Sequence, residues 1–223
     1  MPEPELLETV KLSDGRSLSY ASFGDPAGKP VFYFHGFPGS RFEPQSNHEA
    51  YLKAGIRLLA LDRPGMGEST RKSKRKLLDW PDDVVEVAKI LNLEKFSVLG
   101  VSGGGPYALA CARAIPGYLD KVTVACGLGP MDAPNATSGM MLSNRVLFRY
   151  GRFFPALLRL SVFLMVRQLS SKPVKGFEKF VEGLPEPDRL VLSEPEAQEF
   201  VLASAVEGVC QGSGPLLEEI RIY

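Results

Sequence analysis

The sequence has 223 residues, enough for one large domain with a substantial buried core. Its 26 Lys and Arg residues balance its 26 Asp and Glu residues, so no overall field attracts nucleic acid or an anionic membrane. We also expect no membrane span and no signal peptide, because Arg149, Arg152 and Arg159 interrupt the longest apolar stretch and the N-terminus is acidic.

The first half of the sequence alternates between strand and helix patterns. Alternating polar and apolar residues on both sides of Asp14-Gly15 predict a β-hairpin, because that dipeptide favours a tight turn. Short apolar runs then predict strands, and apolar residues at helical spacing predict helices between them. The strands are expected at 30–37, 56–69, 96–101 and 121–128, the second ending in a Pro/Gly turn, and the helices at 46–54, 77–92 and 104–115.

This alternation is typical of an α/β protein, in which helices cross over between parallel strands. The expected strands are nearly continuous apolar runs, which predicts that helices cover both faces of the sheet. After Gly129 only helical patterns follow, and prolines mark their starts or ends, at 140–153, 155–170, 174–182, 187–193, 195–211 and 215–222. We therefore divide the chain into an α/β part, residues 1–133, and an all-helical part, residues 134–223.

Two smaller features bear on partners and location. The basic run from Arg71 to Lys76 is interpreted as a solvated loop, because no aromatic residue interrupts it. The three cysteines, Cys111, Cys126 and Cys210, lack the spacing of a metal motif, and the first two lie in apolar runs and are predicted to be buried. Together with the missing signal peptide, this favours a cytoplasmic location.

The residues Gly100-Val101-Ser102-Gly103-Gly104 fit the pattern G-x-S-x-G between a predicted strand and a predicted helix. A serine on so sharp a bend needs neighbours without side chains two positions away, so that the backbones can approach closely. Its hydroxyl then projects above the sheet, and the Gly103 amide points from a helix N-terminus toward a developing oxyanion.

Two other interpretations of this segment remain. Residues 103–108 also fit the dinucleotide-binding pattern G-x-G-x-x-A, but the next predicted strand offers no acidic residue for a ribose and Ser102 is left without a role. The other interpretation is a glycine-rich turn without chemistry.

Three ordered segments, HGFPGS (35–40), DRPGMGES (62–69) and GVSGGGPYALA (100–110), resemble the alpha/beta-hydrolase superfamily. The likeness is to small serine esterases, lipases and peptidase-like members with a helical cap, and it covers the chain from about residue 7 onward. It implies that Ser102 is the nucleophile, that the amides of Phe37 and Gly103 form the oxyanion hole, and that His35 supports the oxyanion loop.

The same resemblance makes the helical part a cap that roofs the site and sets substrate choice. Its apolar residues suggest an acyl or otherwise hydrophobic small-molecule substrate, or else they merely pack the cap: Phe148, Phe153, Phe154, Phe163 and Met165. We expect no cofactor and no metal, since two isolated histidines and three scattered cysteines lack ligand spacing.

The base that activates the serine is not evident. The sequence has two histidines, His35 and His48, whereas in the family the catalytic histidine follows the last strand; Asp132 occupies a position that some relatives use for the acid. The strand at 121–128 has an interior pattern but no later strand to pair with, and the last helix lacks a stop signal. We therefore expect an N-terminal part of a longer protein, without the final two strands; the alternative is a naturally short relative.

The predicted function is hydrolysis of an ester, thioester or amide bond through an acyl-enzyme on Ser102, with little activity in a form that lacks the catalytic histidine. The alternative is a non-catalytic ligand-binding relative. A third interpretation keeps the fold and changes the reaction to C–C bond hydrolysis or cofactor-free peroxidation. The substrate and the oligomeric state do not follow from the sequence.

Overall fold

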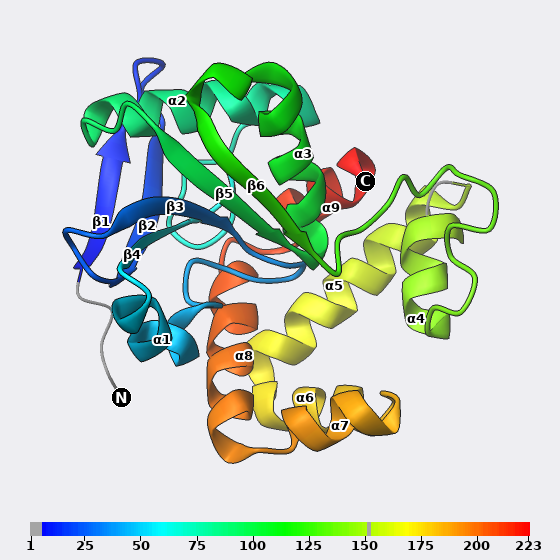
Figure 1. Ribbon diagram of the computed structural model, residues 1–223. Coiled ribbons are helices and arrows are strands. Elements are labelled where there is room, and N and C mark those ends of the chain that lie inside the picture. The colour runs from blue at the N-terminus through cyan, green and yellow to red at the C-terminus, as the bar shows by residue number, and fades with distance from the viewer. Residues whose placement is uncertain (1–5, 151–152) are drawn as a thin grey trace.

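The computed structural model describes residues 6–150 and 153–223, and its centre is a six-stranded sheet (Figure 1). The strand order is β1-β2-β4-β3-β5-β6. The strands are β1 (Leu6–Lys11), β2 (Ser17–Gly24), β3 (Lys29–Phe34), β4 (Ile56–Leu61), β5 (Phe96–Val101) and β6 (Leu119–Ala125). The first two form the predicted hairpin, and each later predicted strand is present, although β3 and β4 end several residues earlier than expected.

The sheet is mostly parallel, as the alternation of strands and helices predicted. Strand β3 pairs in parallel with both β4 and β5, and β5 pairs in parallel with β6. The β1–β2 and β2–β4 pairs are antiparallel. Parallel neighbours need crossover connections, and the crossovers are α1 (His48–Lys53), α2 (Trp80–Ile90) and α3 (Gly105–Ala114).

Alternate side chains of β3 enter different hydrophobic clusters on the two faces of the sheet, as the strand period requires. Phe32 and Phe34 pack with Trp80 of α2 and Tyr107 of α3 in the larger core. Tyr33 faces the other way, into a smaller cluster that includes partly buried side chains of α1. Figure 1 shows α2 and α3 on one side of the sheet and α1 on the other.

Strand β6 departs from the prediction that helices cover both faces of the sheet. It lies at one edge of the described sheet, and its residues are exposed or only partly buried. Val122 and Val124 are exposed, and so is Leu109 of the adjoining helix α3. Cys126, which follows β6, is also exposed, so the prediction of a buried thiol is wrong there, whereas Cys111 is buried as expected.

The helical segment, residues 134–223, lies toward the carboxyl ends of β5 and β6 (Figure 1). Its own small core joins Leu158 and Val162 to Leu216 and Ile220, with Met66 from the loop after β4. In residues 6–150 and 153–223, no helix combines the length and the apolar character needed to cross a membrane. The helices of the segment are α4 (Leu142–Arg145), α5 (Pro155–Ser171), α6 (Pro173–Glu182), α7 (Glu186–Leu192), α8 (Pro195–Gly208) and α9 (Ser213–Ile222).

Candidate active site

Ser102 occupies the bend between β5 and α3. Strand β5 ends at Val101, a short 3-10 turn spans Ser102–Gly104, and α3 begins at Gly105. Ser102 is half-buried and has a φ of 49°, in the left-handed region that a non-glycine residue adopts only when its surroundings hold it there. The predicted context of a strand, a sharp turn and a helix is therefore present.

The glycines on both sides of Ser102 are required by close backbone contacts. A Cβ atom on Gly100 would lie 2.4 Å from the Gly104 carbonyl oxygen, and one on Gly104 would lie 1.9 Å from the Phe34 carbonyl oxygen. Both distances are far shorter than van der Waals contact. The bend thus packs directly against the end of β3, where the next loop begins.

That loop, residues 35–39, lies beside Ser102 and Gly103. A Cβ atom on Gly36 would lie 3.5 Å from the Ser102 Cβ, and one on Gly103 would lie 3.0 Å from the Phe37 Cβ. Outside the regular helices and strands, the hydrogen bonds of the described residues use neither the Phe37 amide nor the Gly103 amide as donor. Two amides near one serine could together bind a negatively charged oxygen.

Glu43 holds the loop from one side, and no sequence pattern predicted this role. The Gly36 amide donates to Glu43 Oε2 at 2.6 Å, and the Tyr33 hydroxyl donates to Glu43 Oε1 at 3.0 Å. Burial raises the pKa of the Glu43 carboxyl, while these two donors favour its ionised form. Glu43 therefore fixes the backbone of the residue before Phe37.

His35 has the structural role that the family resemblance implied. Its side chain is fully buried, Nδ1 lies 2.9 Å from the Gly36 carbonyl oxygen, and Nε2 accepts from the Arg63 amide at 3.4 Å. A carbonyl only accepts, so Nδ1 carries the proton. Burial and the nearby Arg63 lower the pKa of His35 well below its usual value, which keeps the ring neutral.

A buried ion cluster supports the same loop from the helical segment. Glu219 of α9 is fully buried, with Oε1 2.7 Å from Arg63 Nε and Oε2 paired with Arg75. The guanidinium of Arg63 in turn donates to the carbonyls of His35 and of Gly36, the latter at 2.9 Å. Arg75 is buried, so the prediction that the basic run 71–76 is a solvated loop is wrong at that residue.

Two hydroxyl groups complete the shell of Glu219. The Tyr107 hydroxyl donates to Oε2 at 2.9 Å, and the Tyr223 hydroxyl donates to Oε1 at 2.6 Å. Burial would raise the pKa of Glu219, but Arg63 and Arg75 outweigh it and lower the pKa to about 2. The carboxylate thus stays ionised at neutral pH and balances the two arginines beneath the loop.

Aromatic side chains of the helical segment reach the serine bend. The Tyr223 hydroxyl oxygen lies 2.6 Å from the position of a Cβ on Gly103. The Tyr223 ring lies 6.0 Å from that of Phe37 and 6.1 Å from that of Phe148, between ring centroids. Of the aromatic residues expected to face a substrate, Phe148 is therefore near the bend.

The other residues of that set lie elsewhere. Phe153, Phe154 and Phe163 are exposed on the outside of the helical segment, and Met165 packs in its core. The composition of the segment alone could not separate its inner face from its outer face. For those three phenylalanines the expected role of packing the cap is wrong, and the role of facing a substrate stays a prediction.

The remaining candidate residues lie apart from this arrangement. His48 begins α1 and accepts a hydrogen bond from the Gly24 amide at 3.1 Å. Asp132, a weak candidate for the catalytic acid, is exposed. Among residues 6–150 and 153–223, no group of three or more His, Cys, Asp or Glu side chains is placed to hold a metal ion.

Comparison with known proteins gives a family match. The family model described as alpha/beta hydrolase fold matches residues 29–197. The chain is 33% identical over 132 residues to a non-heme chloroperoxidase of Streptomyces lividans, and the match covers 58% of this chain and 48% of that protein. It is 32% identical over 124 residues to a proline iminopeptidase of Arabidopsis thaliana, covering 54% of this chain and 32% of that protein.

Further relatives agree in fold. A bifunctional esterase/perhydrolase of Acinetobacter calcoaceticus is 33% identical over 124 residues, covering 55% of this chain and 45% of that protein. The chain thus matches less than half the length of each of these curated relatives. A bromoperoxidase structure from Bacillus anthracis superposes with a TM-score of 0.67 at 19% identity, covering 98% of this chain and 74% of that chain.

Proposed function

The chain belongs to the alpha/beta-hydrolase fold family, and we propose that it hydrolyses an ester, thioester or amide bond through an acyl-enzyme on Ser102. The observation that carries this proposal is the left-handed bend at Ser102, against which Phe37 of the neighbouring loop packs at Gly103. Other non-glycine residues, such as Lys74 and Cys126, also have a positive φ, so the φ alone does not carry the proposal. What supports a role for the hydroxyl is a serine with this φ at a bend between a strand and a helix, with close-packed glycines at 100 and 104.

In the proposed reaction each residue of the site has a defined chemical role. The Ser102 oxygen attacks the substrate carbonyl carbon, and the amides of Phe37 and Gly103 donate to the resulting oxyanion. The proton that Ser102 gives up passes, through a base that neither His35 nor His48 supplies, to the alcohol, thiol or amine as its bond to the carbonyl carbon breaks. Water then attacks the acyl-enzyme, releases the acid and returns a proton to the Ser102 oxygen. The Glu43 and Arg63 contacts keep the Phe37 amide in place for this step, since both hold Gly36.

The helical segment acts as the cap of this site. Phe148 and Tyr223 contact Phe37 above the bend, which favours an acyl or otherwise hydrophobic small molecule. The printed names of the relatives, an esterase/perhydrolase and an iminopeptidase, are consistent with ester or amide chemistry. In this proposal residues 1–133 are the catalytic core and residues 134–223 the cap.

The histidines favour a second candidate function. His35 is buried and bonded to Gly36 and Arg63, and His48 is bonded to Gly24, so neither serves as a base for Ser102. A protein that has Ser102 and the neighbouring loop but no base to activate the serine would bind an acyl compound without hydrolysing it. This candidate is a ligand-binding relative of the hydrolases.

Chemical rescue separates the two candidates. With p-nitrophenyl butyrate as substrate, added imidazole takes the proton from Ser102, so we expect the release of p-nitrophenol to rise with imidazole well above that of Ser102→Ala. That variant is the matched control, because it subtracts hydrolysis by imidazole alone. A fluorophosphonate probe should label the peptide that contains Ser102.

Equal rates and equal labelling in the two proteins would contradict the hydrolase. Binding of p-nitrophenyl butyrate without turnover, unchanged in Ser102→Ala, would support the ligand-binding relative.

A further inference from the structure

The outer surface of α5 carries an unusual concentration of exposed apolar side chains. Leu158 and Val162 turn inward and are buried in the core of the helical segment. The other side of the helix and the two residues before it have no such cover. Six large side chains there each expose at least 45% of their surface: Phe153, Phe154, Leu157, Leu160, Phe163 and Leu164. Contiguous exposed apolar surface of this kind marks a contact site.

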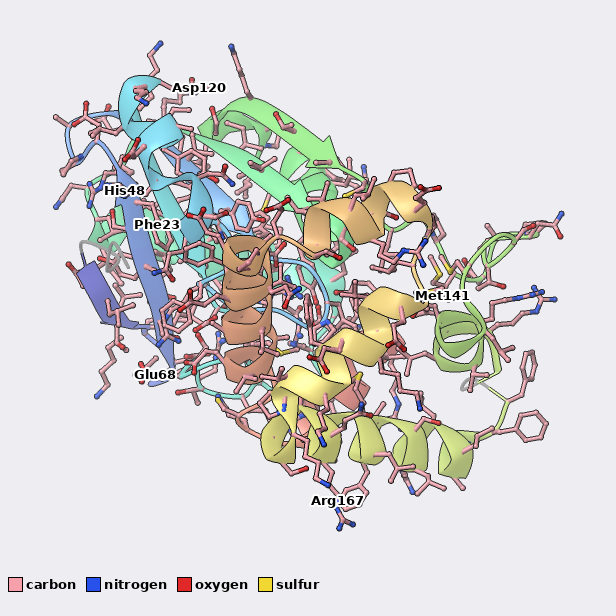
Figure 2. The ribbon with its side chains drawn as sticks, turned by 90° about the horizontal axis from the view of Figure 1, so that it is seen from below. Phe23, His48, Glu68, Asp120, Met141 and Arg167 are labelled. Atoms are coloured by element: carbon pink, nitrogen blue, oxygen red, sulfur yellow. The ribbon has the colours of Figure 1, made fainter. Side chains whose placement is uncertain are left out.

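The sequence around α5 is also basic, although the whole chain has no net charge, and two of its arginines, Arg159 and Arg167, lie on α5 itself. From residue 140 to residue 180 the sequence has eight Lys or Arg residues and a single acidic residue, Glu178. The described basic side chains of this stretch are all exposed, and none takes part in the ion pairs formed within residues 6–150 and 153–223. Figure 2 shows one of them, Arg167, extending from α5 away from the rest of the chain.

From this combination, we propose that the outer surface of α5, residues 153–167, docks on the surface of an anionic lipid bilayer. Apolar side chains that enter the boundary between headgroups and acyl chains, flanked by cations that meet anionic headgroups, are the features of an interfacial helix. The helix lies on the surface and does not span it. The long side chains of Arg159 and Arg167 reach the headgroups while their stems cover neighbouring leucines.

Charge favours an anionic bilayer over two other possible partners of this surface, a second copy of the chain and a nucleic acid. A second copy of the chain, packed on the same surface about a two-fold axis, would bring two basic surfaces together and meet repulsion. A nucleic acid would satisfy the arginines but leave the exposed leucines in water or against phosphates. An anionic bilayer can both pair its headgroups with the arginines and bury the exposed apolar side chains.

Vesicle sedimentation tests the proposal with the purified protein. We expect it to sediment with phosphatidylcholine vesicles that contain phosphatidylserine, to bind pure phosphatidylcholine vesicles at least about tenfold more weakly, and to be released by added salt. The variants Leu160→Ser/Leu164→Ser and Arg159→Glu/Arg167→Glu should each weaken binding by about tenfold or more. Both pairs lie on the exposed surface, so circular dichroism should show an unchanged fold.

Helix α7 provides the matched control. Leu190 and Val191 are also exposed apolar neighbours, but the charges around them are mainly acidic (Glu186, Asp188 and Glu194 against Arg189), so Leu190→Ser/Val191→Ser should bind like the unmodified protein. The proposal is overturned if phosphatidylserine vesicles leave the protein in the supernatant, or if the control pair weakens binding as much as the α5 pairs. It is also overturned if sedimentation velocity shows a dimer that the α5 variants abolish.

Discussion

At the scale of single residues, the contact between Gly104 and the end of β3 sets the position of the serine bend. In Gly104→Ala the added Cβ would lie 1.9 Å from a backbone oxygen that cannot move without opening the sheet. We expect the free energy of unfolding to fall by about 3 kcal/mol, at the upper end of overpacking effects. Urea titration followed by the fluorescence of Trp80, the sole tryptophan, measures it.

Gly117→Ala is the control for that substitution. A Cβ on Gly117 would meet no atom within 4 Å. Its unfolding midpoint should therefore stay close to that of the unmodified protein. Equal losses in the two variants would mean that helix or turn propensity, and not the contact with Phe34, determines the effect.

Single residues also show how far the sequence could predict the site. Ser102 and its glycines form a local pattern, and the Phe37 loop follows from its order in the family, so these were predictable. Glu43 and Glu219 carry no local pattern. Glu219 meets Arg75 across 144 positions of sequence, and only the folded chain brings such residues together. The same holds for Arg75, which had the sequence context of a surface loop and lies buried instead.

At the scale of elements, the apolar periodicity predicted whether a segment is a helix or a strand better than it predicted where that segment ends. Every predicted strand and helix of the α/β part is present, because apolar period and glycine or proline boundaries are local signals. The ends differ where tertiary contacts decide them. Strand β3 stops at Phe34 because His35 turns to bond Gly36 and Arg63, although the apolar run continues to Phe37.

Helix α8 shows how one element of the helical segment stabilises the loop beside the serine. Its Ser204 accepts a hydrogen bond from the Ser40 amide at 2.9 Å, and both residues are buried. In Ser204→Ala the amide loses its acceptor with no water to replace it, and we expect a loss of about 1–3 kcal/mol in the free energy of unfolding. Urea titration of the two proteins at neutral pH measures the difference.

Ser171→Ala in α5 is the paired substitution. Its hydroxyl is exposed and donates to the Arg167 carbonyl, so water can replace it and little stability should be lost. If Ser204→Ala were as stable as Ser171→Ala, α8 would not be a support of the loop.

At the scale of the whole molecule, charge is separated along the chain. The equal numbers of acidic and basic residues correctly indicate no overall field, yet residues 140–180 carry seven positive charges in excess. The rest of the chain therefore carries the matching negative excess. Net charge alone could not reveal this separation. Only the fold shows that the described basic side chains of residues 140–180, spread over α4, α5, α6 and the segments between them, are exposed and outside the ion pairs formed within residues 6–150 and 153–223.

The ion cluster at Glu219 joins the two parts of the molecule and makes their joint stability depend on pH. In the unfolded chain this carboxyl titrates near 4.5, whereas in the folded protein Arg63 and Arg75 overcome the effect of burial and lower its pKa to about 2. The ionised form therefore stabilises the fold above pH 4.5, and this contribution is lost as the pH falls toward 2. A pKa shift of that size contributes about 3 kcal/mol to the free energy of unfolding.

Glu219→Gln tests this linkage across pH. We expect the variant to be about 3 kcal/mol less stable than the unmodified protein at pH 7, with two buried arginines left without a carboxylate. The difference should shrink between pH 4.5 and pH 2, because the unmodified protein then loses the same charge. Glu218→Gln, which removes only the pair between partly buried Glu218 and exposed Arg71, should cost less than about 1 kcal/mol at every pH. Since the cluster ties α9 to the loop beneath Ser102, a Glu219→Gln difference that stayed constant with pH would show that packing of α9, and not its charge, holds the two parts together.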